Sequence, residues 1–208
     1  MTKFPNAPNP DELSGVMIDI ETLDTTQTAV VLSIAAVAFE LTPEGPHFDE
    51  SGLWLLSLNE QLAAGRTISE STLQFWRDQS DDARAHWRDG IPQKVDLVLD
   101  KLSSYITSRD VKNIWANGIT FDIGIVESLY REQGIKLPWR YSAARDSRTL
   151  TRVMPRMRVK AELAEGTLHD PVSDCLNQIW SVWEHWPFDV MALPEERDVL
   201  LKLRTGEL

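Results

Sequence analysis

The chain has 208 residues, 42% of them hydrophobic, and a formal net charge of −11 at pH 7. This length allows one domain with a sizeable core, and no run reaches the about 18 apolar residues that a membrane-spanning helix needs. The single cysteine, Cys175, excludes an intramolecular disulfide, and residues 1–15 lack the apolar region of a signal peptide, so we expect a cytoplasmic protein.

The first half of the chain predicts strands and then helices. Residues 15–22 and 29–41 are rich in Val and Ile and predict two strands, and residues 47–58 predict a third after a turn at 42–45. Helical spacing follows over 67–90, with a predicted capping box from Thr67 to Glu70 and a second helix start at Ser80. Residues 92–109 predict an amphipathic helix.

The second half alternates strands and helices. A short strand is predicted over 111–118, then a helix over 120–138 that ends near Gly134, and then a strand running into a short helix over 140–154. A last helix covers 170–187, with Asp170 as N-cap and Pro171 in the first position. Three adjacent strands followed by alternating elements indicate an α/β fold, a mixed sheet with helices on both faces.

Two acids lie inside the first predicted strand, in the stretch GVMIDIET. Asp19 and Glu21 are two residues apart, so their side chains project from the same face of the strand. Carboxylates this close repel one another, and burying them unpaired costs free energy. Either a cation holds them together, or they lie at a solvated strand end and pair with arginines.

Three further candidate residues lie at element ends. Asp122 begins the predicted helix that follows an Asn-Gly turn, where a carboxylate also commonly interacts with the helix dipole. His169 precedes the last predicted helix, and Asp174 follows it by five residues, on the first turn. Each of these signals is weak by itself.

Taken together and in order, Asp19-x-Glu21, Asp122 and His169-x(4)-Asp174 resemble the DEDD superfamily of 3′→5′ exonucleases. The histidine spacing marks the DEDDh branch, which includes the proofreading exonucleases and RNase T. The local sequence is similar to that of the phage-type exodeoxyribonucleases and small bacterial exoribonucleases. The similar segments are MIDIET, VVLSIAAVAFE, STLQFWRDQS, IWANGITFDIGIVESLYRE, RDSRTL and LHDPVSDC.

This resemblance covers residues 16–183 and implies an α/β, RNase H-like fold with a mixed five-stranded sheet flanked by helices. The expected organisation is an exonuclease domain over 15–186, between a loose N-terminal lead-in (1–14) and a C-terminal extension (187–208). The expected chemistry is hydrolysis of phosphodiesters with release of 5′-mononucleotides.

The resemblance also implies two divalent cations, Mg²⁺ or Mn²⁺, which prefer carboxylate oxygens and lie roughly 3.5–4 Å apart in such sites. By the family pattern, Asp19 bridges both ions and Glu21 and Asp174 complete the shell of one. Asp122 holds the other through water. His169 is the expected general base, because neutral imidazole can take a proton from water.

Five more residues are candidates for substrate binding. Asn117 either bonds the substrate or caps its turn, and Phe121 and Trp76 either stack a terminal base or pack in the core. Arg145 and Arg148 belong to an arginine-rich stretch over 139–161, with seven cations against one acid. These cations either solvate a helix and its flanks or line a path for phosphates.

The interpretation that follows is a metal-dependent 3′→5′ exonuclease acting on the 3′ ends of single-stranded nucleic acid, with DNA favoured over RNA. A catalytically inactive nucleic-acid-binding or adaptor module on the same fold is one alternative, and a nucleotide phosphohydrolase is another. No membrane partner is expected. A homo-oligomer is compatible with the sequence, which does not determine the oligomeric state.

Overall fold

The computed structural model describes residues 14–42, 44–154, 156 and 169–186. The lead-in over 1–13 and the extension over 187–208 lie outside the described residues, as do Arg158 and Lys160 of the arginine-rich stretch. The elements are, in order, β1 (Gly15–Thr22), β2 (Val31–Thr42), β3 (Gly45–Phe48), β4 (Gly52–Leu55), α1 (Leu58–Ala63), α2 (Glu70–Asp78), α3 (Asp81–Arg88), α4 (Val95–Thr107), β5 (Asn113–Ala116), α5 (Asp122–Gln133), β6 (Ala144–Asp146), α6 (Ser147–Val153) and α7 (Pro171–His185).

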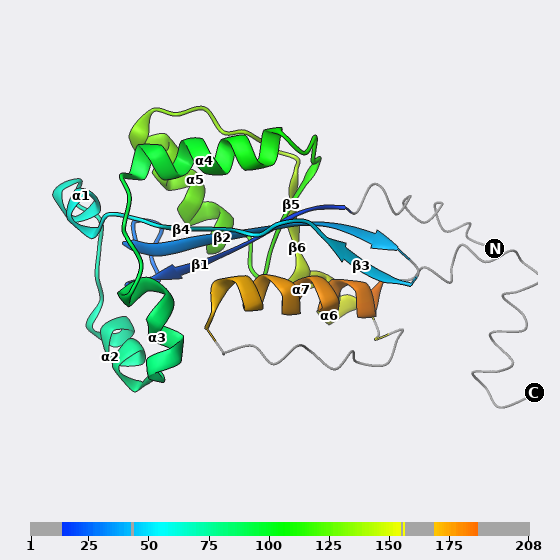
Figure 1. The fold of residues 1–208 in the computed structure, drawn as a ribbon, viewed down its shortest axis with the longest axis horizontal. Coiled ribbons are helices and arrows are strands. Elements are labelled where there is room, and N and C mark those ends of the chain that lie inside the picture. Colours follow the sequence, from blue (N-terminus) through cyan, green and yellow to red (C-terminus); the bar gives the residue numbers. More distant parts are fainter. Residues whose placement is uncertain (1–13, 43, 155, 157–168, 187–208) are drawn as a thin grey trace, which may run out of the picture.

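The strands form one mixed sheet in the order β3-β2-β1-β5-β6, and β4 also pairs with β2. β1 is antiparallel to β2 and parallel to β5, and β5 is parallel to β6. Figure 1 shows α4 and α5 on one face of this sheet and α6 and α7 on the other. None of the helices that the structure describes is both long and apolar enough to cross a membrane.

The alternation of side chains along β1 decides which layer each residue meets. Val16, Ile18 and Ile20 belong to the core between the sheet and helices α4 and α5. Met17 points the other way, into a core with Cys175 and Ile179 of α7. Because side chains two residues apart share a face, Asp19 and Glu21 lie on the α7 side, where this apolar core gives way to acids.

The predicted α/β fold with its mixed sheet is confirmed, but the sheet has six strands and not five. The segment predicted as one strand over 47–58 is two, β3 and β4, separated by an irregular segment at 49–51. Within this segment the backbone N–H of Glu50 donates to Oδ1 of Asp49 at 2.7 Å. This local side-chain bond competes with ladder pairing, and each short strand pairs separately with β2.

The first helix start in the 67–90 region is also two residues later than predicted. Ser69 is the N-cap of α2, and its side chain accepts from the backbone N–H of Thr72. Thr67 instead donates its N–H to the carbonyl of Thr28 and pairs with the loop after β1. The prediction of a capping box at Thr67 was wrong because this long-range pairing keeps that residue extended, whereas the second start at Ser80 is confirmed.

Candidate active site

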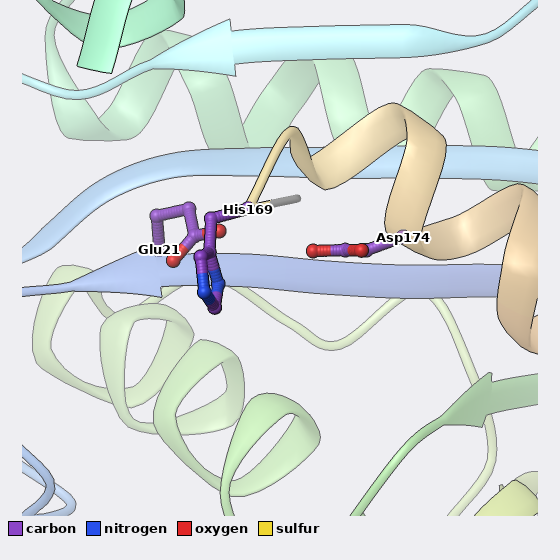
Figure 2. A group of neighbouring side chains, drawn as sticks. All are labelled: Glu21, His169 and Asp174. Atoms are coloured by element: carbon purple, nitrogen blue, oxygen red, sulfur yellow. The ribbon is translucent and has the colours of Figure 1, made fainter. Parts of the chain in front are cut away.

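Acids at the carboxyl end of β1 face the start of α7. Glu21, His169 and Asp174 each offer one ligand atom, and these three atoms all lie within 4.8 Å of one another. Figure 2 shows Glu21 on β1, His169 in the turn before α7, and Asp174 on the helix with its carboxylate directed toward the other two. Glu21 therefore lies in one cluster with two residues that follow it by 148 and 153 positions in the chain.

The start of α7 explains how His169 and Asp174 reach this cluster. The side chain of Asp170 caps the helix by accepting from the N–H of Ser173 at 2.8 Å, and Pro171 occupies the first turn. His169 has a left-handed backbone with φ of 65°, so the chain turns at this residue, immediately before the N-cap Asp170. The sharp turn brings the imidazole and the first-turn carboxylate to the same side of the helix end (Figure 2).

Asp19 lies one pleat before Glu21 and is held by α7. Its Oδ1 accepts from Nε2 of Gln178 at 2.7 Å, and both residues line a cavity with Asp174 and Asn117. The other end of the same amide, Oε1 of Gln178, is buried without a hydrogen-bond partner among the described residues. An unsatisfied buried carbonyl oxygen beside several carboxyl groups is a second acceptor suited to a water molecule or a cation.

Asp122 reaches the site from the first turn of α5. Its side chain is buried, and burial raises its pKa to about 7, although backbone N–H groups and the positive charge of Arg148 act in the opposite direction. The Arg148 guanidinium donates to the carbonyl oxygen of Asn117 at 2.7 Å and lies against Gly118, whose φ is 120°. A side chain at position 118 would crowd this guanidinium, so the glycine allows the arginine to approach Asp122.

The electrostatics of the cluster are those of crowded like charges. Burial first, and then the like charges of Asp19, Asp174 and Asp122, together raise the pKa of Glu21 to about 9. Burial also raises the pKa of Asp19 well above its usual range, with Asp122 as the next cause. The pKa of Asp174 is raised by burial, with His169 opposing. Four carboxyl groups that destabilise one another in this way fit divalent cations, because hard oxygen donors are the preferred ligands of Mg²⁺ and Mn²⁺.

We expect the metal-free protein to lose thermal stability as the pH rises from about 5 to 9. The folded-state pKa of Glu21, about 9, lies above its ordinary value of 4.5, so the folded state binds more protons than the unfolded state between these values. Stability therefore falls as the pH increases through this window. A saturating divalent cation supplies the missing positive charge and should flatten the dependence.

Thermal melts in EDTA and in Mg²⁺ across this pH range measure both slopes. Glu21→Gln is the control, since an amide does not titrate, and its slope in EDTA should be shallower than that of the wild type. Equal slopes for the two proteins in EDTA would contradict the prediction.

The structure buries one of the aromatic substrate-binding candidates and partly buries the other. Trp76 is 4% exposed, and its Nε1 donates to the carbonyl of Thr22 at 2.8 Å, so it is a core residue. Phe121 is partly buried against the core under α4 and α5. Of the two roles weighed for these side chains, core packing is the one that their burial supports. Asn117, by contrast, is exposed and lines the cavity with Asp19.

The arginines of the arginine-rich stretch point in different directions. Arg148 lies beside Asn117 and Asp122, as described above. Arg145 donates to the carbonyls of Ser142 and Ala144 and lines a separate groove along β6. Arg156 pairs with the buried carboxylate of Glu184 at 3.1 Å. One stretch of sequence therefore supplies cations to three places.

Two residues of the site were missed from the sequence. Gln178 follows Asp174 by four positions, so helical spacing places both on one face, and this signal could have identified it. Phe75 is 39% exposed, and its ring centroid is 5.1 Å from that of His169 with the planes at 85°. The ring centroid of Trp76 is 6.4 Å from that of the same imidazole, also in an edge-to-face arrangement. Two aromatic rings of α2 therefore restrain the ring of His169.

The chain is similar to known nucleases. The sequence model of the family described as 3′-5′ exoribonuclease Rv2179c-like domain matches residues 14–186. The exodeoxyribonuclease of Enterobacteria phage T4 is 27% identical over 195 residues, covering 78% of this chain and 85% of the phage protein. The crystal structure of cell-death related nuclease 4 matches with a TM-score of 0.44 and 15% identity, covering 82% of this chain. The chain spans 62% of the length of that nuclease.

Proposed function

The chain belongs to the 3′-5′ exoribonuclease Rv2179c-like domain family and is a DEDDh-type exonuclease, and from this premise we propose that it removes mononucleotides from the 3′ ends of single-stranded nucleic acid. The observation that carries the proposal is the meeting of Glu21, His169 and Asp174 within 4.8 Å, beside the buried acids Asp19 and Asp122. Such a set of groups suits the hydrolysis of a phosphodiester.

Divalent cations fit this donor set, and we propose that Asp19, Glu21, Asp122 and Asp174 hold two of them. When bound, they would neutralise the charge of the phosphate and assist ionisation of the attacking water. The pKa values raised by burial and mutual repulsion mean that the carboxyl groups release protons as a cation arrives. Gln178 orients Asp19 through its 2.7 Å hydrogen bond.

We assign to His169 the role of proton acceptor from the attacking water. The imidazole lies beside the carboxyl groups of Glu21 and Asp174, in the same cluster of ligand atoms, and a neutral imidazole can take a proton from water. The edge-to-face contacts with Phe75 and Trp76 limit rotation of the ring. We assign Arg148, whose positive charge acts on Asp122, to a phosphate of the substrate.

The sugar preference is part of the proposal. The matching family is described as an exoribonuclease and the phage relative is named an exodeoxyribonuclease, so we propose that the site accepts both RNA and DNA. A contact to the 2′-hydroxyl is what distinguishes the two at a given site.

A polarity experiment tests the function. We expect 12-nucleotide single strands of DNA and RNA carrying a 5′ label to shorten in single-nucleotide steps with Mg²⁺ or Mn²⁺. The same strands carrying a 3′ label should release that label at once as a mononucleotide, and EDTA should stop both reactions.

Each other outcome points to a different function. Early release of a 5′ label as a mononucleotide would reverse the proposed direction. Binding without cleavage in every metal would support an inactive binding module, and turnover of free nucleotides alone would support a phosphohydrolase.

A further inference from the structure

A groove runs along β6 at the edge of the sheet, outside the carboxylate cavity. Its lining includes Lys112, Arg140, Arg145, Thr149, Leu150 and Val153. β6 is the last strand of the sheet on this side, and α6 follows it directly. Residues of the edge strand β6 and of helix α6 therefore both line the groove.

Helix α6 separates this groove from the candidate active site. Ser147 and Thr151 line the cavity that contains Asp19 and Asp174. Thr149 and Val153, on the other side of the same short helix, line the groove. Arg148 stands between the two, exposed at the start of α6 and bonded to Asn117 of the cavity. The cavity and the groove therefore have α6 as a common wall.

The groove is lined by three cations and two acids, a net charge of +1 in a protein whose net charge is −11. Lys112, Arg140 and Arg145 are all exposed, and within the described part of the chain none of them forms an ion pair. Two acids, Asp110 and Asp146, also line it. The carboxylate of Asp146 caps α6, accepting from the N–H of Arg148 and the hydroxyl of Thr149, so it is held at the helix start and keeps its charge.

An exposed aromatic ring accompanies these cations. Tyr141 is 98% exposed and, although its side chain does not line the groove, it lies between the lining residues Arg140 and Ser142 on the loop that leads into β6. Exposed cations interleaved with an aromatic side chain are the combination that binds single strands, since cations contact phosphates and rings stack on bases without sequence preference.

We propose that the groove along β6 binds the part of a single-stranded nucleic acid upstream of its 3′-terminal nucleotides, with Arg140, Arg145 and Lys112 on its phosphates and Tyr141 stacked on a base. This inference rests on the proposed exonuclease function, because it places the reacting 3′ end in the carboxylate cavity. It predicts that the groove contributes to long substrates and not to the shortest ones.

The test compares a dinucleotide with a 12-nucleotide single strand, using the full chain and its variant Arg140→Gln/Arg145→Gln. We expect kcat/KM for the 12-mer to fall on the order of tenfold near 0.1 M salt, and the slope of log binding against log salt to fall by about 1.4, which is about 0.7 for each lost contact. Activity on the dinucleotide should stay within about twofold of the wild type, since a dinucleotide does not reach the groove.

Two matched variants separate the groove from general effects. Lys101→Gln/Arg131→Gln removes the same charge from exposed positions on α4 and α5 and should leave both substrates unaffected. Tyr141→Ala should weaken the 12-mer alone, and Tyr141→Phe should restore it, since phenylalanine keeps the ring. Equal losses on both substrates, or an unchanged salt slope, would overturn the proposal.

Failure of the proposed function gives a different result. If the wild type cleaves neither substrate, fluorescence anisotropy of a labelled 12-mer still measures the groove, and the arginine variant must then bind more weakly with a smaller salt slope. Equal binding by wild type and variant would reject the groove whether or not the chain is a nuclease.

Discussion

Replacing Asp19 by asparagine is expected to abolish cleavage while leaving the metal-free protein as stable as the wild type or more stable. Asp19 accepts from Gln178 and lies among Asp122 and Asp174, and burial and these like charges raise its pKa well above the usual range. An asparagine keeps the shape and removes the repulsion, so the apo protein gains or keeps stability. It also removes a ligand from the proposed metal pair, and the catalytic rate should fall by several orders of magnitude.

The measurement is a pair of readings on one protein preparation: the rate on a 5′-labelled single strand with Mg²⁺ and the melting temperature in EDTA. Asp49→Asn is the control, because the N–H of Glu50 and the Arg109 side chain lower the pKa of this carboxyl, so its charged form is favoured by folding. That variant should be fully active and slightly less stable. If Asp19→Asn turns over near the wild-type rate with Mg²⁺, Asp19 is not a ligand of the catalytic metal ions.

Replacing His169 by alanine is expected to lower kcat on the order of 10²–10⁴-fold, the usual effect of removing a positioned proton acceptor. Binding of divalent cations should change little, because the four carboxyl groups remain. The acidic limb of the pH–rate profile should shift or flatten, since water can then lose its proton only to the solvent or under the influence of the bound cations.

Single-turnover rates of both proteins between pH 5.5 and 9 test this expectation. His47→Ala, an exposed histidine on β3, is the control and should match the wild type. Because His169 also contacts Phe75 and Trp76, melting temperatures must show that the variant is folded. If wild type and His169→Ala share the same acidic limb, the limb belongs to metal or substrate binding and His169 is not the base.

Much of the fold followed from local patterns. The end of α5 near Gly134 was predicted, and the structure has this glycine in the left-handed conformation at φ of 66°, bonded to the carbonyl of Arg131. The cap of α7 by Asp170 and the start of α3 at Ser80 were predicted in the same way. These features depend on residues within one turn of each other, so short stretches of sequence are sufficient to specify them.

Where a feature depended on a distant partner, local patterns were misleading. Threonine is a common N-cap residue, but Thr67 pairs with the loop after β1. The N-cap of α2 is Ser69 instead. Phe75 and Trp76 are adjacent in the chain and chemically alike, yet one is 39% exposed and the other 4%. Arg145 and Arg148 are equally basic, but only Arg148 reaches Asp122. The direction of each side chain is decided by what packs against it.

The sequence by itself determined the α/β class, the ends of several helices and the shared face of Asp19 and Glu21, because a strand repeats every two residues. Only the tertiary structure decided that this face meets the first turn of α7, that Asp122 arrives through the parallel pairing of β1 with β5, and that Gln178 bonds Asp19. Those contacts join residues about 100 to 160 positions apart, and their geometry comes from the packing of whole elements on a sheet, which no local pattern encodes.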